Sequence, residues 1–155
     1  MKVLISILDD IDFNQVIIFV DGRNRCQRIV TQLKKEGYPC GLLYGQLDQS
    51  SRENQFGRFR RGDLRILVAT DLCGRGIDVE KVNLVVNFDM PDNSDQFLHR
   101  VGRAGRFGTK GVAISFVDEK VERDKTVLDE VKQRFAVAIE ELPMSVKDIP
   151  IIYYK

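Results

Sequence analysis

Residues 66–78 read Ile66-Leu67-Val68-Ala69-Thr70-Asp71-Leu72-Cys73-Gly74-Arg75-Gly76-Ile77-Asp78, a short apolar run that leads directly into a polar segment with two glycines. The apolar part is strand-sized and does not alternate, which is typical of a strand covered on both faces in a parallel sheet. Ligands of such sheets bind beyond the carboxyl ends of the strands, where the polar part lies, and its glycines allow the backbone to approach a phosphate closely. Residues 70–78 are therefore a candidate site, although the segment taken alone fits an ordinary turn with capping residues better.

Apolar runs of the same kind predict strands at four other places, residues 16–20, 40–44, 84–88 and 112–116. Between them, apolar residues recur with the 3.6-residue period of amphipathic helices. We expect such helices around Cys26, Ile29, Val30 and Leu33, over residues 49–61 with Phe56 and Phe59 as anchors, around Phe97, and around Leu128, Val131 and Phe135. Gly37 is expected to end the first helix, and Ser94 to cap the start of the third. The alternation of strands and helices predicts a three-layer α/β/α domain with a mostly parallel sheet.

The length of 155 residues fits a single domain with one packed core, which we expect to cover residues 1–155. The 24 lysines and arginines nearly balance the 23 acidic residues, and the net charge is +1. Such a balance produces no long-range basic field, so any nucleic-acid binding must come from arginines gathered on one surface. Residues 143–155 lose the helical periodicity and are expected to run over the surface.

The three cysteines are odd in number and lack a C-x-x-C spacing, and His99 is the only histidine. This composition argues against a zinc site, so we assign no metal ligands. We expect Cys26, Cys40 and Cys73 to be reduced, mostly buried thiols of an intracellular protein. No apolar run approaches the roughly 20 residues that span a bilayer, and residues 1–8 do not form a secretory signal. The sequence therefore predicts no membrane association.

A second candidate site is the basic segment His99-Arg100-Val101-Gly102-Arg103-Ala104-Gly105-Arg106. One explanation is a solvated helix face, but each glycine inside a helix costs about 1 kcal/mol relative to alanine. At 100° per residue, His99, Arg103 and Arg106 would share one narrow sector of a helix. The apolar side chains expected on the other side are Phe97, Leu98, Val101 and Ala104. Because guanidinium groups bind phosphate oxygens in pairs, this layout predicts a phosphate-binding face.

A third candidate site is Gly45-Gln46-Leu47-Asp48-Gln49-Ser50-Ser51-Arg52, a strand-end glycine followed by the start of a polar helix. The amides at the start of that helix, together with Gln49 and Arg52, could hold a sugar-phosphate backbone. An ordinary helix start is the better explanation when this segment is taken alone. Arg58, Arg60 and Arg61 later in the same helix are expected to be solvated charge.

Together and in this order, the three segments resemble the C-terminal RecA-like domain of DEAD-box RNA helicases. Residues 16–20 are similar to the motif IV strand of that family, residues 49–52 to its Q-x-x-R element, residues 69–71 and 75–78 to motif V, and residues 99–106 to motif VI. The resemblance extends from about residue 13 to residue 143. Within the family, residues 98–111 and 134–143 look most like the spliceosome-associated mRNA-export helicases.

The resemblance implies an ATP-dependent RNA helicase in which an N-terminal domain holds most of the ATP and its Mg²⁺. Arg103 and Arg106 would be arginine fingers that reach the γ-phosphate and offset the charge developing on the transferred phosphoryl group. Asp78 would contact the ribose, and Gly76 would leave room for the nucleotide beside it. Three further residues would organise the contact between the domains or serve a structural role, namely Arg75, His99 and Arg100.

The resemblance also implies partners and a location. Phosphates and 2′-hydroxyls of single-stranded RNA would be bound without regard to sequence by Gly45, Gln49, Arg52 and Thr70. The N-terminal helicase domain of the same protein would be the second partner. Splicing or export factors and a nuclear location follow from the subfamily alone.

The sequence also departs from the family pattern. Tyr44 stands where many relatives have histidine, and Asp21-Gly22-Arg23 differs from the usual residues after motif IV, so the resemblance assigns no role to Asp21 or Arg23. No G-x-x-x-x-G-K-[ST], D-E-x-D box or Q-motif is present, and the family carries all three in its N-terminal domain. We therefore expect half an active site, with negligible ATP hydrolysis and weak RNA binding by this chain alone.

Two other functions stay open at this point. One is a non-catalytic RNA-binding or protein-docking module that has kept the helicase fold. The other is a related helicase that acts on DNA, which would not distinguish a 2′-hydroxyl from a deoxy strand.

Overall fold

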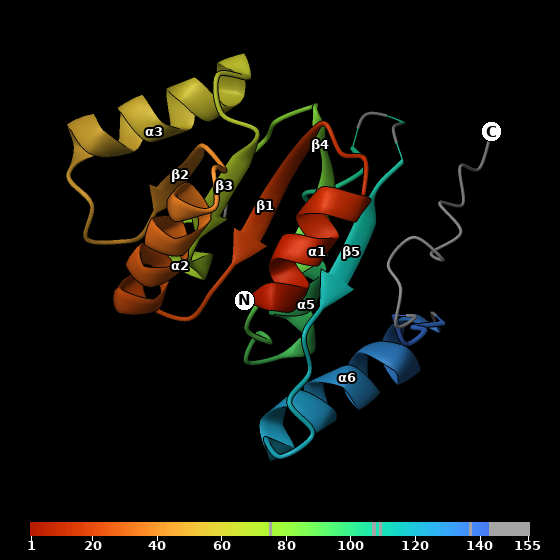
Figure 1. The fold of residues 1–155 in the computed structure, drawn as a ribbon. Helices are drawn as coiled ribbons and strands as arrows, with labels where there is room; N and C mark the ends of the chain where they lie inside the picture. The colour runs from red at the N-terminus through yellow and green to blue at the C-terminus, as the bar shows by residue number, and fades with distance from the viewer. Residues whose placement is uncertain (75, 107, 109, 137, 143–155) are drawn as a thin grey trace.

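The centre of the molecule is a five-stranded sheet in the order β2-β3-β1-β4-β5 (Figure 1). The computed structural model describes residues 1–74, 76–106, 108, 110–136 and 138–142. Its strands are β1 Gln15–Phe19, β2 Cys40–Leu43, β3 Ile66–Ala69, β4 Val82–Asn87 and β5 Val112–Ser115. All five predicted strands are confirmed, and every neighbouring pair is parallel, with Val16 opposite Ile66 on one side of β1 and Leu84 on the other.

Six helices accompany the sheet in the described part of the chain. Their bounds are α1 Lys2–Asp10, α2 Arg23–Lys35, α3 Gln49–Arg61, α4 Asp71–Gly74, α5 Ser94–Val101 and α6 Glu122–Phe135. The four predicted helices are confirmed. Helix α1 was not predicted, although the spacing of its buried Leu4, Ile7 and Leu8 is that of an amphipathic helix. Residues 143–155 lie outside the described residues.

The helices form a layer on each face of the sheet because successive side chains of a strand point to opposite faces. Val16, Ile18 and Val20 pack with the apolar sides of α1 and α2. Ile17 and Phe19 belong to the core on the other face, which α3 covers with Phe59. Figure 1 shows α1 and α2 in front of the sheet and α5 behind it. This is the predicted three-layer α/β/α arrangement.

Helix α6 is held by a smaller apolar cluster rather than by the sheet. Val127 and Val131 of α6 pack with Phe97 of α5 and with Met90, which follows β4. Helix α6 thus packs on α5 and on residues that follow β4, and its position depends on side chains near the carboxyl end of β4.

Two details of α5 differ from the prediction. The N-cap is Asn93, whose side chain accepts a hydrogen bond from the Gln96 amide, and not Ser94, which is the first helical residue. Asparagine caps a helix as well as serine does, so composition alone could not separate the two. Leu98, predicted on the apolar side, is 45% exposed. The positive φ of 88° at Gly37, just after α2, confirms its role as a helix stop.

Candidate functional site

Gly45, Thr70 and Arg100 lie at the edge of the sheet where β2, β3 and β4 end. Because the strands are parallel, their carboxyl ends meet at one edge. Gly45 follows β2, Thr70 follows β3, and Arg100 of α5 contacts the residues at the end of β4. Residues 103–106 lie farther back, toward the start of β4, where the Gly105 amide donates to the Val82 carbonyl. Thr70 is tied to the neighbouring strand, since its amide donates to the carbonyl of Leu43 at 3.0 Å. Arg75 lies outside the described residues.

Arg100 is the buried centre of this edge, with 1% of its surface exposed. Its Nε and NH2 groups donate to the two carboxylate oxygens of Asp71, each at 2.6 Å. Its NH1 group donates to the carbonyl of Asp89 at 2.6 Å and to Oδ1 of Asn87 at 3.3 Å. The guanidinium also lies over the ring of Phe19, 5.2 Å from its centre. Arg100 therefore binds the ends of β1 and β4 and the start of α4 into one unit.

This arrangement gives Arg100 a role inside the domain. A buried guanidinium is stable only when its donors are satisfied, and here a bidentate carboxylate and two further oxygens satisfy them. The side chain of Asp71 is itself only 30% exposed. Since Arg100 is enclosed, any effect on a second domain would pass through the residues that it holds.

Arg103 and Arg106 lie at the surface after α5, nearer to the start of β4 than Arg100 is. Helix α5 ends at Val101, earlier than the periodicity predicts, and the chain continues in tight turns, with the Arg103 amide donating to the Arg100 carbonyl. Arg106 pairs with Asp78 at 2.8 Å, the two side chains being 39% and 51% exposed. Arg103 NH1 donates to the carbonyl of Ile77 at 2.9 Å. The turns, rather than a shared helix face, bring both arginines to residues 77–78.

The two guanidiniums are close enough to repel each other. Partial burial lowers the pKa of Arg103, the charge of Arg106 lowers it further, and Asp78 opposes both effects. Even a lowered arginine pKa leaves the group charged near neutral pH. This surface therefore carries two neighbouring guanidiniums beside Asp78, and closely spaced positive charges favour an incoming anion.

Gly105 of the basic segment allows a close approach to the backbone of Gly111. Gly105 has φ of 70°, and its amide donates to the carbonyl of Val82 at the start of β4. A Cβ at Gly105 would lie 2.7 Å from the nitrogen of Gly111, and one at Gly111 would lie 2.6 Å from the nitrogen of Gly105. Both positions exclude a side chain, which fixes the turn that carries Arg106.

A pocket of about 520 Å³ opens between α3 and α4 at this edge. Four of the predicted site residues line it, namely Gly45, Gln49, Arg52 and Gly76. Arg52 NH2 donates to the carbonyl of Gly45 at 3.0 Å, so this arginine also fixes the loop after β2. Leu72, 80% exposed, contributes an apolar wall. The RNA-binding and nucleotide-binding predictions thus meet in one depression.

The two remaining predicted residues, His99 and Gln49, are both exposed. His99 is exposed on α5, and its carbonyl accepts from Arg103 Nε at 3.0 Å. Gln49 is exposed at the start of α3, where Asp48 caps the helix by accepting from the Ser51 amide. Both side chains can reach a ligand, and neither holds the fold together.

Sequence reasoning missed the partners of Arg100. Asn87 and Asp89 close β4 and could have been found by the rule that chemistry gathers at the carboxyl ends of parallel strands. Asp71 belongs to the first candidate segment but had no predicted role. No signal in the sequence pairs Asp71 with Arg100, because the pair depends on how α4 and α5 pack.

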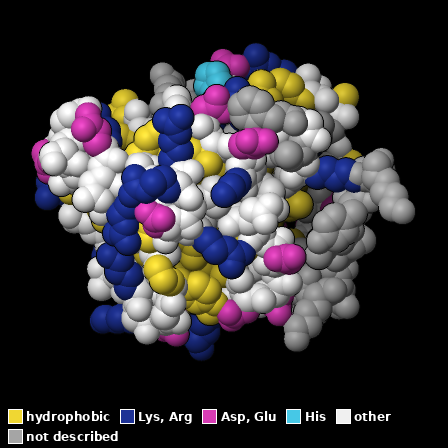
Figure 2. All heavy atoms as spheres, turned by 90° about the horizontal axis from the view of Figure 1, so that it is seen from above, with side chains coloured by type: hydrophobic (Ala, Val, Ile, Leu, Met, Phe, Trp, Pro, Cys, Tyr) yellow, Lys and Arg dark blue, Asp and Glu magenta, His cyan; other side chains and the backbone are white. Residues whose placement is uncertain are grey.

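The opposite edge of the sheet, where the strands begin, carries a mixture of basic and acidic side chains. Figure 2 views the molecule from that side and shows lysines and arginines interspersed with acidic side chains. Arg58, Arg60 and Arg61 are exposed in the last turn of α3, and Arg61 pairs with Asp63 at 3.1 Å. Basic side chains favour the carbonyl end of a helix, which explains their place without a ligand.

The cysteines are free thiols. Cys26 and Cys40 are buried and Cys73 is half-buried beside the pocket. Burial raises the pKa of Cys26 to about 12 and that of Cys40 to about 11, so neither is a reactive thiolate. Within the described residues, no group of three or more histidine, cysteine or acidic side chains is arranged to hold a metal ion, and no helix is long and apolar enough to cross a membrane.

Comparisons with known proteins agree with this geometry. The model of the helicase conserved C-terminal domain matches residues 1–108. DEAD-box ATP-dependent RNA helicase 56 of Oryza sativa subsp. japonica is 50% identical over 138 residues, which are 89% of this chain and 32% of that protein. ATP-dependent RNA helicase DDX39A of Homo sapiens is 47% identical over 140 residues, which are 90% and 32% of the two chains.

A solved structure gives the same result. S. cerevisiae Dbp5 bound to RNA and ADP BeF3 superposes with a TM-score of 0.80 at 33% sequence identity, over 89% of this chain and 36% of that one. The chain spans about one third of the length of the curated relatives named above. The RecA-like fold expected from the sequence is therefore confirmed.

Proposed function

This chain belongs to the helicase conserved C-terminal domain family, in its DEAD-box branch, and from that premise we propose that its full-length protein hydrolyses ATP to separate or remodel RNA. The observation that supports this most directly is the pair Arg103 and Arg106, which lie together at an exposed edge beside Asp78. An N-terminal ATP-binding domain of the same protein would face this edge and complete the site. This chain would supply half of the catalytic groups.

In the complete site, Arg103 and Arg106 are the arginine fingers. A phosphoryl group in transfer develops charge on its outer oxygens, and guanidiniums placed beforehand stabilise that charge without reorganising. The NH1 group of Arg103 donates to the Ile77 carbonyl and that of Arg106 to Asp78, so both guanidiniums lie beside residues 77–78 before ATP arrives. Mg²⁺ would be held by the N-terminal domain and would supply further neutralisation of the phosphate charge.

When the two domains close on ATP, Arg106 and Asp78 would each exchange the other for a group of the nucleotide. Asp78 is proposed to bind the ribose and Arg106 the γ-phosphate, so the ion pair between them separates when the nucleotide enters. An exposed ion pair of this kind contributes about 1 kcal/mol or less, which a charge-assisted contact to phosphate readily replaces. Hydrolysis and phosphate loss would allow the pair to re-form.

RNA would bind beside the nucleotide, along Gly45, Gln49, Arg52 and Thr70. The pocket shared by three of these residues with Gly76 supports this placement. Backbone-directed contacts to phosphates and 2′-hydroxyls carry no base information, so binding would not depend on sequence. Dbp5, similar in fold to this chain, is described as bound to RNA and ADP BeF3.

Closure of the two domains would couple the ligands. If ATP and RNA both favour the closed state, each tightens the binding of the other. The further proposal, that the protein acts in splicing and mRNA export in the nucleus with factors of those pathways, rests on its likeness to the export helicases, supported by the match to DDX39A.

The test is RNA-stimulated ATP hydrolysis by the full-length protein and its Arg106→Ala variant. We expect stimulation by RNA in the wild type and a loss on the order of 10³-fold in the variant, because the finger acts on the transition state. Arg61→Ala is the matched control, since Arg61 is also exposed and paired with an aspartate, but this pair is at the end of α3 and does not include Asp78. An Arg106→Ala variant that hydrolyses ATP as fast as the wild type would favour the non-catalytic binding or docking module.

A further inference from the structure

The loop after β1 contains Asp21, to which the family resemblance assigns no role, yet this carboxylate lies beside the buried Arg100. Asp21 Oδ1 is 3.8 Å from Arg100 NH2. The Asp21 amide donates to Asp89 Oδ2 at 2.8 Å, and the Asp89 carbonyl is itself a partner of Arg100. Asp21 is thus attached to the Arg100 centre both by charge and through its backbone.

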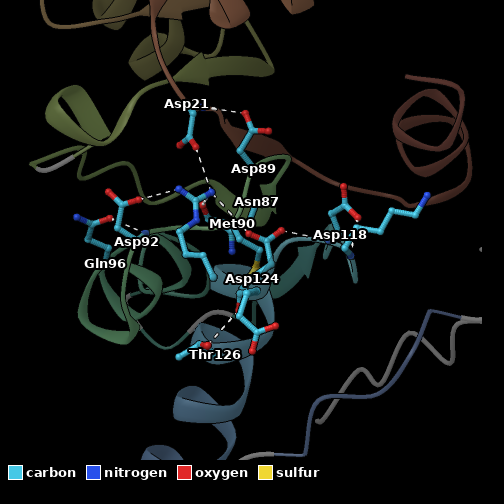
Figure 3. Close-up of polar contacts among 12 residues, drawn as sticks. Asp21, Asn87, Asp89, Met90, Asp92, Gln96, Asp118, Asp124 and Thr126 are labelled. Carbon is cyan, nitrogen blue, oxygen red and sulfur yellow. Dashed lines mark hydrogen bonds and ion pairs between the residues drawn. The ribbon is translucent and has the colours of Figure 1, made fainter.

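The other carboxylate oxygen of Asp21 faces helix α6. Arg123, in the first turn of α6, places NH2 at 3.5 Å from Asp21 Oδ2. The same guanidinium donates to Asp92 Oδ1 at 2.9 Å and to the Met90 carbonyl at 3.4 Å. In Figure 3, Asp21 lies above and Asp92 to the left of the guanidinium to which dashed lines join them. Arg123 therefore joins α6 to the loops after β1 and β4.

Charge explains why this contact determines the position of Asp21. The loops after β1 and β4 and the start of α6 bring together four carboxylates, namely Asp21, Asp89, Asp92 and Asp124. Burial raises the pKa of Asp21, and the neighbouring Asp89 raises it further, whereas Arg123 and Arg100 lower it. Without Arg123, the repulsion from Asp89 and Asp92 is less compensated, and Asp21 gains by turning away toward water.

We propose that Arg123 is a positioning residue of the ATP-facing edge, which acts through Asp21 on Arg100 and thereby on Asp71 and the segment leading to Asp78. The inference rests on the proposed function for its catalytic consequence. The docking of α6 would affect Asp71 through a continuous series of ion pairs. The series runs from Arg123 to Asp21, from Asp21 to Arg100, and from Arg100 to Asp71.

Helix α6 contains its own control. Arg134, in the last turn, makes the same kind of contact, with NH1 at 2.6 Å from Asp95 Oδ1 and 3.1 Å from Ser94 Oγ. The side chains of Arg123 and Arg134 are similarly exposed, 42% and 50%. These contacts of Arg134, however, anchor α6 to the start of α5 and involve neither Asp21 nor Arg100. A loss of helix docking alone would affect both variants, whereas loss of positioning would affect only one.

The first experiment follows Arg100 directly. In full-length protein labelled with ¹⁵N-arginine, the Nε–H of Arg100, which is bound to Asp71, gives an exchange-protected signal that the Arg100→Lys variant assigns. We expect Arg123→Gln to speed its exchange about fivefold and Arg134→Gln to leave it unchanged. In an Asp21→Asn background, Arg123→Gln should add little, because the link to Arg100 is already broken. Equal effects of the two arginine variants, or full additivity with Asp21→Asn, would overturn the proposal.

The second experiment measures the consequence for ATP hydrolysis in the same protein. Arg123→Gln should lower the RNA-stimulated kcat about fivefold with little change in the KM for ATP, because the arginine edge acts in the transition state. Arg123→Lys should recover part of the loss, and Arg134→Gln should match the wild type. A wild type without RNA-stimulated hydrolysis would remove the proposed function, whereas the Arg100 exchange rates would still decide this inference. An unchanged kcat in Arg123→Gln beside an active wild type would overturn it.

Discussion

Arg100 and Arg106 belong to the same short basic segment and have opposite surroundings. Arg100 is enclosed by Asp71, Asn87 and the Asp89 carbonyl, while Arg106 is 39% exposed with one carboxylate beside it. The buried guanidinium uses four of its five N–H donors on the domain itself. The exposed one can exchange its partner for a ligand. The difference shows that the buried half of the segment holds the domain together, whereas the exposed half can contact a ligand.

The comparison predicts opposite effects of the same substitution on stability. Arg100→Gln should lower the free energy of unfolding by about 3 kcal/mol, because it removes the buried guanidinium and leaves the half-buried Asp71 without its partner. Arg106→Gln should cost at most about 1 kcal/mol, since its ion pair is exposed. Urea denaturation of both variants measures the two values. Similar losses would mean that the buried and exposed halves are not distinct.

The turn between the two halves can be tested next. Gly105→Ala should destabilise the protein by about 3 kcal/mol, because an alanine there meets the Gly111 backbone and must also keep a positive φ. Gly108 has φ of 78° but open space around its Cβ position, so Gly108→Ala should cost only about 1 kcal/mol. Thermal unfolding measures both changes. If Gly108→Ala costs as much as Gly105→Ala, backbone contact does not fix the turn.

The smallest predicted effect concerns the start of α5, the helix that carries Arg100. Asn93→Ala should cost about 1 kcal/mol, because the Gln96 amide loses its acceptor at the start of α5. Asn93→Ser, which restores an acceptor, should be close to the wild type. Urea denaturation again gives the values, and a Ser variant as unstable as the Ala variant would show that the cap is not what stabilises α5.

The sequence predicts the sheet well because each strand is a continuous apolar run, and burial on both faces leaves little room for another interpretation. The site follows from the same pattern, since parallel strands bring their carboxyl ends together at one edge. It does not separate Arg100 from Arg106, because burial depends on the packing of α4 and α5. The periodicity also extends α5 through the arginines, whereas the helix ends at Val101 with Gly102 as its C-cap, and Gly105 then packs against the Gly111 backbone.

The strand order has a consequence for how the protein is made. β1, the central strand, is hydrogen-bonded to β3 and β4, and β2 is not its neighbour. On a ribosome, β1 emerges before its neighbours in the sheet and has no partner strand until the chain has passed through α2, β2 and α3. Closing so long a loop costs chain entropy before the strand contacts form, and it is therefore slow. In the meantime the apolar run of β1 stays exposed to non-native contacts. Nascent chains that stall before Ile66 should therefore depend on chaperones, and those that stall after Asn87 should be largely independent of them.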